Sequence, residues 1–82
     1  MINVLFFASL REQLGCEGLQ AEASGITDIA GLRTSLAAKG SEWQAALASD
    51  QLQVALNQKL SSMEAAVKDG DEVAFFPPVT GG

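Results

Sequence analysis

Two short apolar segments near opposite ends of this 82-residue chain constrain its fold most strongly. Residues 2–8 and 72–76 are rich in β-branched and aromatic side chains, a composition typical of strands. Successive side chains of a strand point to opposite faces of a sheet, and each segment carries bulky apolar groups on both faces. The pattern indicates central strands or a second, partner-facing surface. We expect the two segments to lie together in the middle of a sheet.

The remaining strands show simpler patterns. Apolar and polar residues alternate over 19–23 and 52–56, which predicts half-buried strands there. A short strand over 59–62 is expected to pair back on the second of these. Pro77 and Pro78 end the last strand, because proline has no N–H to donate to a neighbouring strand.

One main helix is predicted over residues 28–38, with Thr27 as its N-cap. Its apolar stripe, Ile29, Leu32 and Leu36, has the spacing of a helix that covers one face of a sheet. Shorter helices are expected over 10–14, capped by Ser9, and around 43–47. The order of elements predicts a single α+β domain with a small mixed sheet.

The composition excludes several function classes. The net charge is −5 and the chain has five Lys and Arg residues and no histidine, which argues against nucleic acid and anionic membrane surfaces. The apolar start lacks a positive n-region and is too short for a signal peptide, so we expect a cytoplasmic protein. Cys16 is the only cysteine, and without a histidine to activate it we expect an inert residue rather than a nucleophile.

Two further groups have competing interpretations. Trp43 is expected to fill the core rather than to bind a ligand, because tryptophan buries a large area. Asp69, Asp71 and Glu72 lack the spacing of a calcium loop, so we expect a solvated acidic turn and no metal.

The chain ends in Pro77-Pro78-Val79-Thr80-Gly81-Gly82, which has the pattern of a reactive tail. Glycine has no Cβ, so Gly81 and Gly82 fit a channel too narrow for side chains. When extended, residues 77–82 reach up to about 20 Å, enough to enter a buried site on a neighbour. We therefore divide the chain into a globular domain over 1–76 and a flexible, extended tail over 77–82.

Two motifs resemble a known family. Val4-Leu5-Phe6-Phe7-Ala8-Ser9-Leu10-Arg11-Glu12 is similar to the opening of the small, sulfur-carrier subunits of molybdopterin synthase. Residues 55–58 and the run Asp69-Gly70-Asp71-Glu72-Val73-Ala74-Phe75-Phe76-Pro77-Pro78-Val79-Thr80-Gly81-Gly82 are very similar to the closing signature of that family. The resemblance implies a β-grasp, ubiquitin-like fold.

The resemblance also implies a function in molybdenum cofactor biosynthesis. The Gly82 carboxylate would be adenylated by a partner enzyme that uses MgATP. Sulfur from a persulfide donor would then convert it to a thiocarboxylate. The large synthase subunit would receive the tail, Pro77 to Gly82, and transfer the sulfur to a cyclic pyranopterin precursor. The chain itself would be a non-catalytic carrier without a stably bound cofactor, in a heterotetramer of two small and two large subunits.

A docking surface is a separate expectation from the strand pattern. Phe7 and Phe76 should point away from the face that the helix covers, with Leu60 near them. Exposed apolar patches and aromatic residues mark partner sites, although the same residues would also suit an ordinary sheet. Arg11 at the edge would pair with a partner carboxylate or remain a solvated charge.

Other functions stay open at this point. Gly-Gly also fits a sulfur carrier for thiamine or tRNA thiolation, although the motif before it favours the molybdopterin family. A ubiquitin-like modifier, or a pure binding module, joined to targets through Gly82 is the alternative from another class. A free-standing enzyme has almost no support, because no nucleophile–base pair is present.

Overall fold

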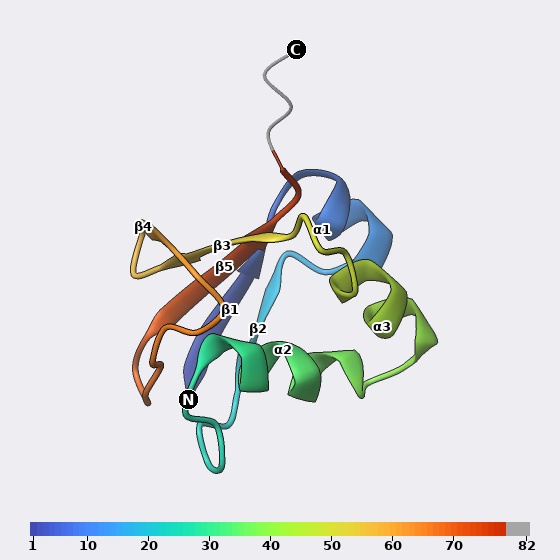
Figure 1. Cartoon of the computed structure of the whole chain (residues 1–82). Coiled ribbons are helices and arrows are strands. Elements are labelled where there is room, and N and C mark those ends of the chain that lie inside the picture. The colour runs from blue at the N-terminus through green and yellow to red at the C-terminus, as the bar shows by residue number, and fades with distance from the viewer. Residues whose placement is uncertain (79–82) are drawn as a thin grey trace.

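The structure is a computed structural model that describes residues 1–78. The described part contains β1 (Ile2–Phe6), α1 (Ala8–Leu14), β2 (Gly18–Ala21), α2 (Ile29–Ala37), α3 (Ser41–Leu47), β3 (Gln53–Leu56), β4 (Lys59–Ser61) and β5 (Glu72–Phe76). The predicted α+β class is confirmed, with α2 as the main helix (Figure 1).

The five strands form one mixed sheet in the order β2-β1-β5-β3-β4. β1 and β5 pair in parallel, with Val4 opposite Val73, and the other neighbours are antiparallel. The prediction that the first and last strands lie together in the middle of the sheet is therefore confirmed. Because β1 and β5 run in the same direction, β5 ends at the edge of the sheet opposite to the N-terminus (Figure 1).

The helices cover one face of this sheet. The predicted stripe on α2, Ile29, Leu32 and Leu36, is buried. It joins the core with the side chains that the central strands point to the same face: Ile2, Val4, Phe6, Val54, Val73 and Phe75. Burial of apolar area on this face is the main force that holds the layers together.

Trp43 is partly buried and packs at the edge of the core rather than inside it. Its ring meets that of Phe6 edge to face, with 5.6 Å between the centroids. The ammonium group of Lys39 lies 5.5 Å from the indole centroid. The prediction of a packing role is confirmed, although solvent reaches part of the ring.

The first strand is shorter than predicted. The Phe7 N–H still donates to the Phe75 carbonyl at 3.2 Å, but Ala8 has a φ of 57° and turns the chain into α1. Ala8 therefore belongs to the helix and does not share the core face of β1. Ser9 lies inside α1, so its predicted role as N-cap is wrong; Phe7 occupies that position.

The main helix begins one residue later than predicted. Asp28, not Thr27, is the N-cap, and its carboxylate accepts a hydrogen bond from the Gly31 N–H at 2.8 Å. The first two N–H groups of the helix, those of Ile29 and Ala30, donate to the carbonyls of Ala65 and Met63. A distant loop thus completes the cap, which local sequence patterns do not reveal.

No helix within residues 1–78 is long and apolar enough to cross a bilayer.

Candidate functional site

An apolar groove of about 650 Å³ lies on the face of the sheet that the helices leave uncovered. Its lining comes from β1, β3, β5 and the turns that follow them: Leu5, Phe7, Ala8, Ala55, Gln58, Glu72, Ala74, Phe76 and Pro77. Seven of these nine side chains are apolar, and they come from segments far apart in the sequence. Such a surface is suited to docking another protein rather than to acid–base chemistry.

The groove exists because small residues lie between large ones. Ala55 and Ala74 face each other across the β3–β5 ladder and form the floor. Larger side chains at neighbouring positions surround the two alanines: Leu5, Phe7 and Phe76. A partner side chain placed over the two alanines would be surrounded by apolar groups.

The structure brings three of the four predicted docking residues to this face. Phe7 and Phe76 line the groove, and Phe7 is 45% exposed. Leu60 pairs with Ala55 across the β3–β4 ladder and is 73% exposed, so it lies on the same face just outside the groove. Arg11 does not line the groove. Its exposed guanidinium lies 4.0 Å from the carboxylate of Glu17, in the loop between α1 and β2.

Six groove residues were not predicted as site residues: Leu5, Ala8, Ala55, Gln58, Glu72 and Ala74. Leu5 and Ala74 share their strand faces with Phe7 and Phe76, so the period-two pattern contained the signal. Ala55 is placed by the pairing of β3 with β5, and Gln58 by the turn between β3 and β4. A single sequence specifies neither.

The predicted tail leaves the sheet beside this groove. β5 ends at Phe76, and Pro77 lines the groove while Pro78 lies against a smaller cavity between α1 and α3. Val79, Thr80, Gly81 and Gly82 lie outside the described residues. The extended tail and the chemistry of Gly82 therefore stay predictions.

The sequence predicted a solvated acidic turn before β5, but the structure buries one carboxylate of this turn. Asp69 is exposed and pairs with the N-terminal ammonium, but Asp71 is only 6% exposed. The Asp71 carboxylate accepts hydrogen bonds from the Lys68 N–H at 2.9 Å and the Asn57 amide at 3.1 Å. These bonds lower the pKa of Asp71, the one from the Lys68 backbone most, and they outweigh the opposing effect of burial.

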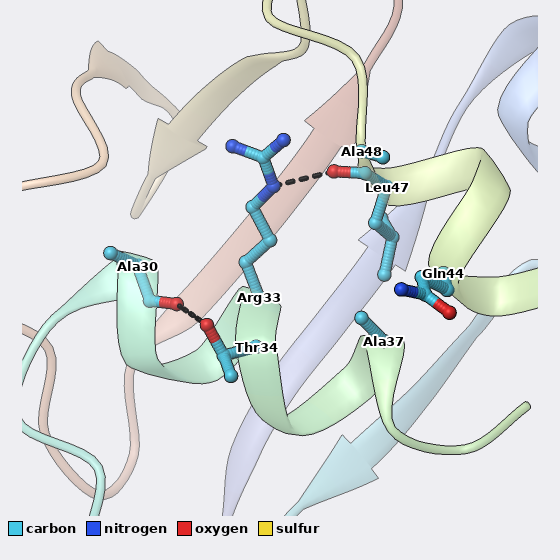
Figure 2. Close-up of a pocket in the computed structure, with 7 residues that line it drawn as sticks. All are labelled: Ala30, Arg33, Thr34, Ala37, Gln44, Leu47 and Ala48. Carbon is cyan, nitrogen blue, oxygen red and sulfur yellow. Dashed lines mark hydrogen bonds between the residues drawn. The ribbon is translucent and has the colours of Figure 1, made fainter.

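A second cavity, of about 270 Å³, lies between α2 and α3 (Figure 2). Arg33 reaches from α2 across this cavity and donates to the Leu47 carbonyl and, at 3.1 Å, to the Ser49 carbonyl. The Thr34 hydroxyl donates to the Ala30 carbonyl of its own helix. Arg33 therefore joins α2 to the C-terminal end of α3, which is a structural role.

The remaining candidates fit structural roles. Cys16 is half-buried against the core, and its thiol donates to the Gly18 carbonyl at 3.1 Å. Within residues 1–78, no three His, Cys, Asp or Glu side chains are grouped so that they would hold a metal ion.

Comparison with known proteins decides the family. The ThiS family model matches residues 4–82, almost the whole chain. The chain belongs to the ThiS family. A full-length relative, the molybdopterin synthase sulfur carrier subunit of Haemophilus influenzae, is 54% identical over 82 residues, and the match covers all of both chains. The resemblance inferred from the two terminal motifs is thus confirmed.

Solved structures agree with the ThiS assignment. SAMP1 from Haloferax volcanii has a TM-score of 0.77 at 26% identity, covering 99% of this chain and 98% of that one. The complex of subunits 1 and 2 of the molybdopterin-converting factor from Helicobacter pylori contains a chain with a TM-score of 0.67 at 29% identity. That match covers 99% of this ThiS-family chain and 97% of the other. The β-grasp fold predicted from the resemblance is confirmed.

Proposed function

We propose that this chain is the sulfur-carrier subunit of a molybdopterin synthase and that Gly82 carries the sulfur. The observation that carries the proposal is the full-length match, at 54% identity, to a curated sulfur carrier subunit of that enzyme. The C-terminal Gly-Gly supplies the carboxylate that such a role requires.

The chemistry begins with activation of Gly82 by an adenylating enzyme. A carboxylate is a poor acyl electrophile, so its oxygen first attacks the α-phosphorus of MgATP and pyrophosphate leaves. A persulfide sulfur then attacks the carbonyl carbon of the acyl-adenylate and AMP leaves. A thiol reductant cleaves the resulting acyl disulfide and releases the thiocarboxylate. The chain needs no bound cofactor of its own for these steps, because its role is to carry and present the group.

Delivery takes place on the large subunit, which we propose holds the catalytic site. The apolar groove fits the docking step, because Pro77 lines it at the point where the tail begins. A partner seated over Ala55 and Ala74 would therefore lie next to the root of the tail. The complex of subunits 1 and 2 from Helicobacter pylori supports a partner of this kind.

The assembly and location follow the family resemblance. Each dithiolene carries two sulfurs, so two charged carriers are used per product, and we propose a heterotetramer of two small and two large subunits. We place the protein in the cytoplasm, in keeping with its single half-buried cysteine.

Reconstitution tests this function. The purified chain is charged with its activating enzyme, MgATP and a persulfide donor, then mixed with the large subunit and the pyranopterin precursor. We expect formation of the dithiolene product, and no product when Gly82 is deleted. A chain that is charged but gives no product, and instead supports thiazole or tRNA thiolation, would indicate a carrier for another pathway. Isopeptide adducts to lysine without sulfur transfer would indicate a modifier.

A further inference from the structure

The β3–β4 hairpin turns through two residues with left-handed backbones. Asn57 has a φ of 51° and Gln58 a φ of 71°. A two-residue turn with positive φ at both positions matches the twist of the flanking strands. Asparagine tolerates this conformation, whereas a glutamine there is strained. The turn therefore depends on contacts that hold it in place.

Asn57 extends the β3–β5 ladder one step beyond its last regular pair, Leu56 with Val73. Its N–H donates to the Glu72 carbonyl at 2.8 Å. Its side-chain Oδ1 accepts from the Glu72 N–H at 2.9 Å. The side chain thus supplies the acceptor that a backbone carbonyl would supply in a continuing strand.

Asp71 fixes the other end of the same amide. Asn57 Nδ2 donates to Asp71 Oδ1 at 3.1 Å, while the Lys68 N–H holds Oδ2 at 2.9 Å. The Lys68 ammonium lies 3.3 Å from Oδ1 but is largely exposed. Because the Asp71 carboxylate is buried, leaving one of its hydrogen bonds unmade is costly, so it orients the Asn57 side chain.

These contacts extend to the apolar groove. Gln58 and Glu72 line one end of the groove, and Asn57 lies with them around a small adjoining cavity. Leu60 follows two residues after Gln58 on the uncovered face of the sheet. A shift of the turn would move this end of the groove and Leu60 together.

We propose that Asn57 and Asp71 form a latch that holds the β3–β4 hairpin in the position required for docking of the large subunit. Both are positioning residues, because they act through Gln58, Leu60 and Glu72 rather than by touching the reacting group. The inference rests on the proposed function for the identity of the partner. The latch itself is a property of the free chain and is measured there as well.

An exchange of the two side chains tests the latch. In N57D the new carboxylate faces that of Asp71, and in D71N the new amide has a single oxygen for two donors, the Asn57 N–H₂ and the Lys68 N–H. In the double variant N57D/D71N the carboxylate at position 57 accepts from the Glu72 N–H and from the amide at position 71. That amide's oxygen accepts from the Lys68 N–H, so the hydrogen bonds of the latch are restored with reversed polarity.

Two readouts are used: the Kd for the large subunit by calorimetry, and amide hydrogen exchange of Asn57 and Glu72 in the free chain. We expect each single variant to weaken binding about tenfold, as is typical for coupled hydrogen-bonded neighbours, and to speed exchange of both amides. The double variant should recover most of the affinity and the protection. L36V, in the core face of α2, is the control for a general loss of stability.

Each other outcome overturns part of the account. Single variants with wild-type affinity and exchange, or a double variant as impaired as both singles combined, would contradict the latch. A loss of affinity in L36V equal to that in N57D, at matched stability, would contradict a positioning role. If the wild-type chain does not bind the large subunit, the proposed function fails, and the exchange data alone decide whether the latch holds the hairpin.

Discussion

At the scale of single residues, Asp71 makes the stability of the fold depend on pH. Its carboxylate is buried next to the turn that begins β5, and it is hydrogen-bonded to Lys68 and Asn57. A carboxylate stabilised in its charged form by such bonds has a lower pKa in the folded chain than in the unfolded one. Protonation of Asp71 therefore lowers the free energy of unfolding.

The pH dependence of unfolding follows from this shift. Because the folded pKa of Asp71 is lowered from its ordinary value of 3.8, its contribution to stability is fully present above that value and is lost as the pH falls through the folded pKa. We expect wild type to be more stable than D71N at neutral pH, and the difference in urea midpoint to shrink below about pH 4. The exposed substitution Asp50→Asn is the control. A difference that stays constant down to about pH 2 would contradict this role of Asp71.

Residue patterns identified which segments are helical but not how the helices begin. Thr27 and Ser9 have typical capping side chains, yet Asp28 and Phe7 hold the cap positions. For α2 the reason is tertiary, because carbonyls of Met63 and Ala65 accept from its first N–H groups. Asp71 was likewise expected in solvent, since its burial depends on a hairpin fourteen residues away.

At the scale of elements, the close packing of β2 against β1 depends on Gly18. A Cβ at this position would lie 2.5 Å from the Val4 carbonyl oxygen and 3.1 Å from a methyl group of Leu5. Val4 is in the central part of β1 and is fully buried, so its backbone has little room to move.

Gly18→Ala tests this contact. We expect the free energy of unfolding to fall by about 1–3 kcal/mol, the usual cost of overpacking. Glu22→Ala, an exposed change just after β2, should stay within about 0.5 kcal/mol of wild type. Urea denaturation checks both values. A G18A variant as stable as wild type would show that β2 shifts freely against β1.

The central strands were predicted from sequence because both faces of residues 2–8 and 72–76 are apolar, and they do lie side by side. The apolar groove was predicted only in part. Phe7, Phe76 and Leu60 stand out as large apolar residues, whereas the groove itself is made by Ala55 and Ala74. Small residues in a strand carry no such signal. Whether Ala55 and Ala74 lie opposite each other depends on the register of β3 with β5.

At the scale of the whole molecule, the groove and the root of the tail lie together. β1 and β5 run in parallel, so the turn at Phe7 and the end of β5 at Phe76 reach the same edge of the sheet (Figure 1). On the helix side, smaller cavities lie between α2 and α3 and between α1 and α3. The arrangement favours docking through the uncovered face.

Filling the groove should block docking without unfolding the chain. Ala55→Leu places a larger side chain on the floor, and we expect it to weaken binding of the large subunit at least about tenfold, as for loss of a hot-spot pocket. Thermal unfolding should change little, because the added atoms point away from the core. Ala48→Leu, which enters the cavity between α2 and α3, is the matched control and should bind normally. Equal binding by both variants would rule out the groove as the docking site.

The sulfur-carrying role proposed for Gly82 can be tested with a single mass measurement. The chain is incubated with its activating enzyme, MgATP and a persulfide donor, and its mass is measured intact and after trypsin, which cleaves after Lys68 and releases residues 69–82. We predict the gain of one oxygen-to-sulfur exchange, confined to that C-terminal peptide and absent when Gly82 is deleted. An unchanged peptide, obtained with an activating enzyme that charges another carrier, would contradict the account.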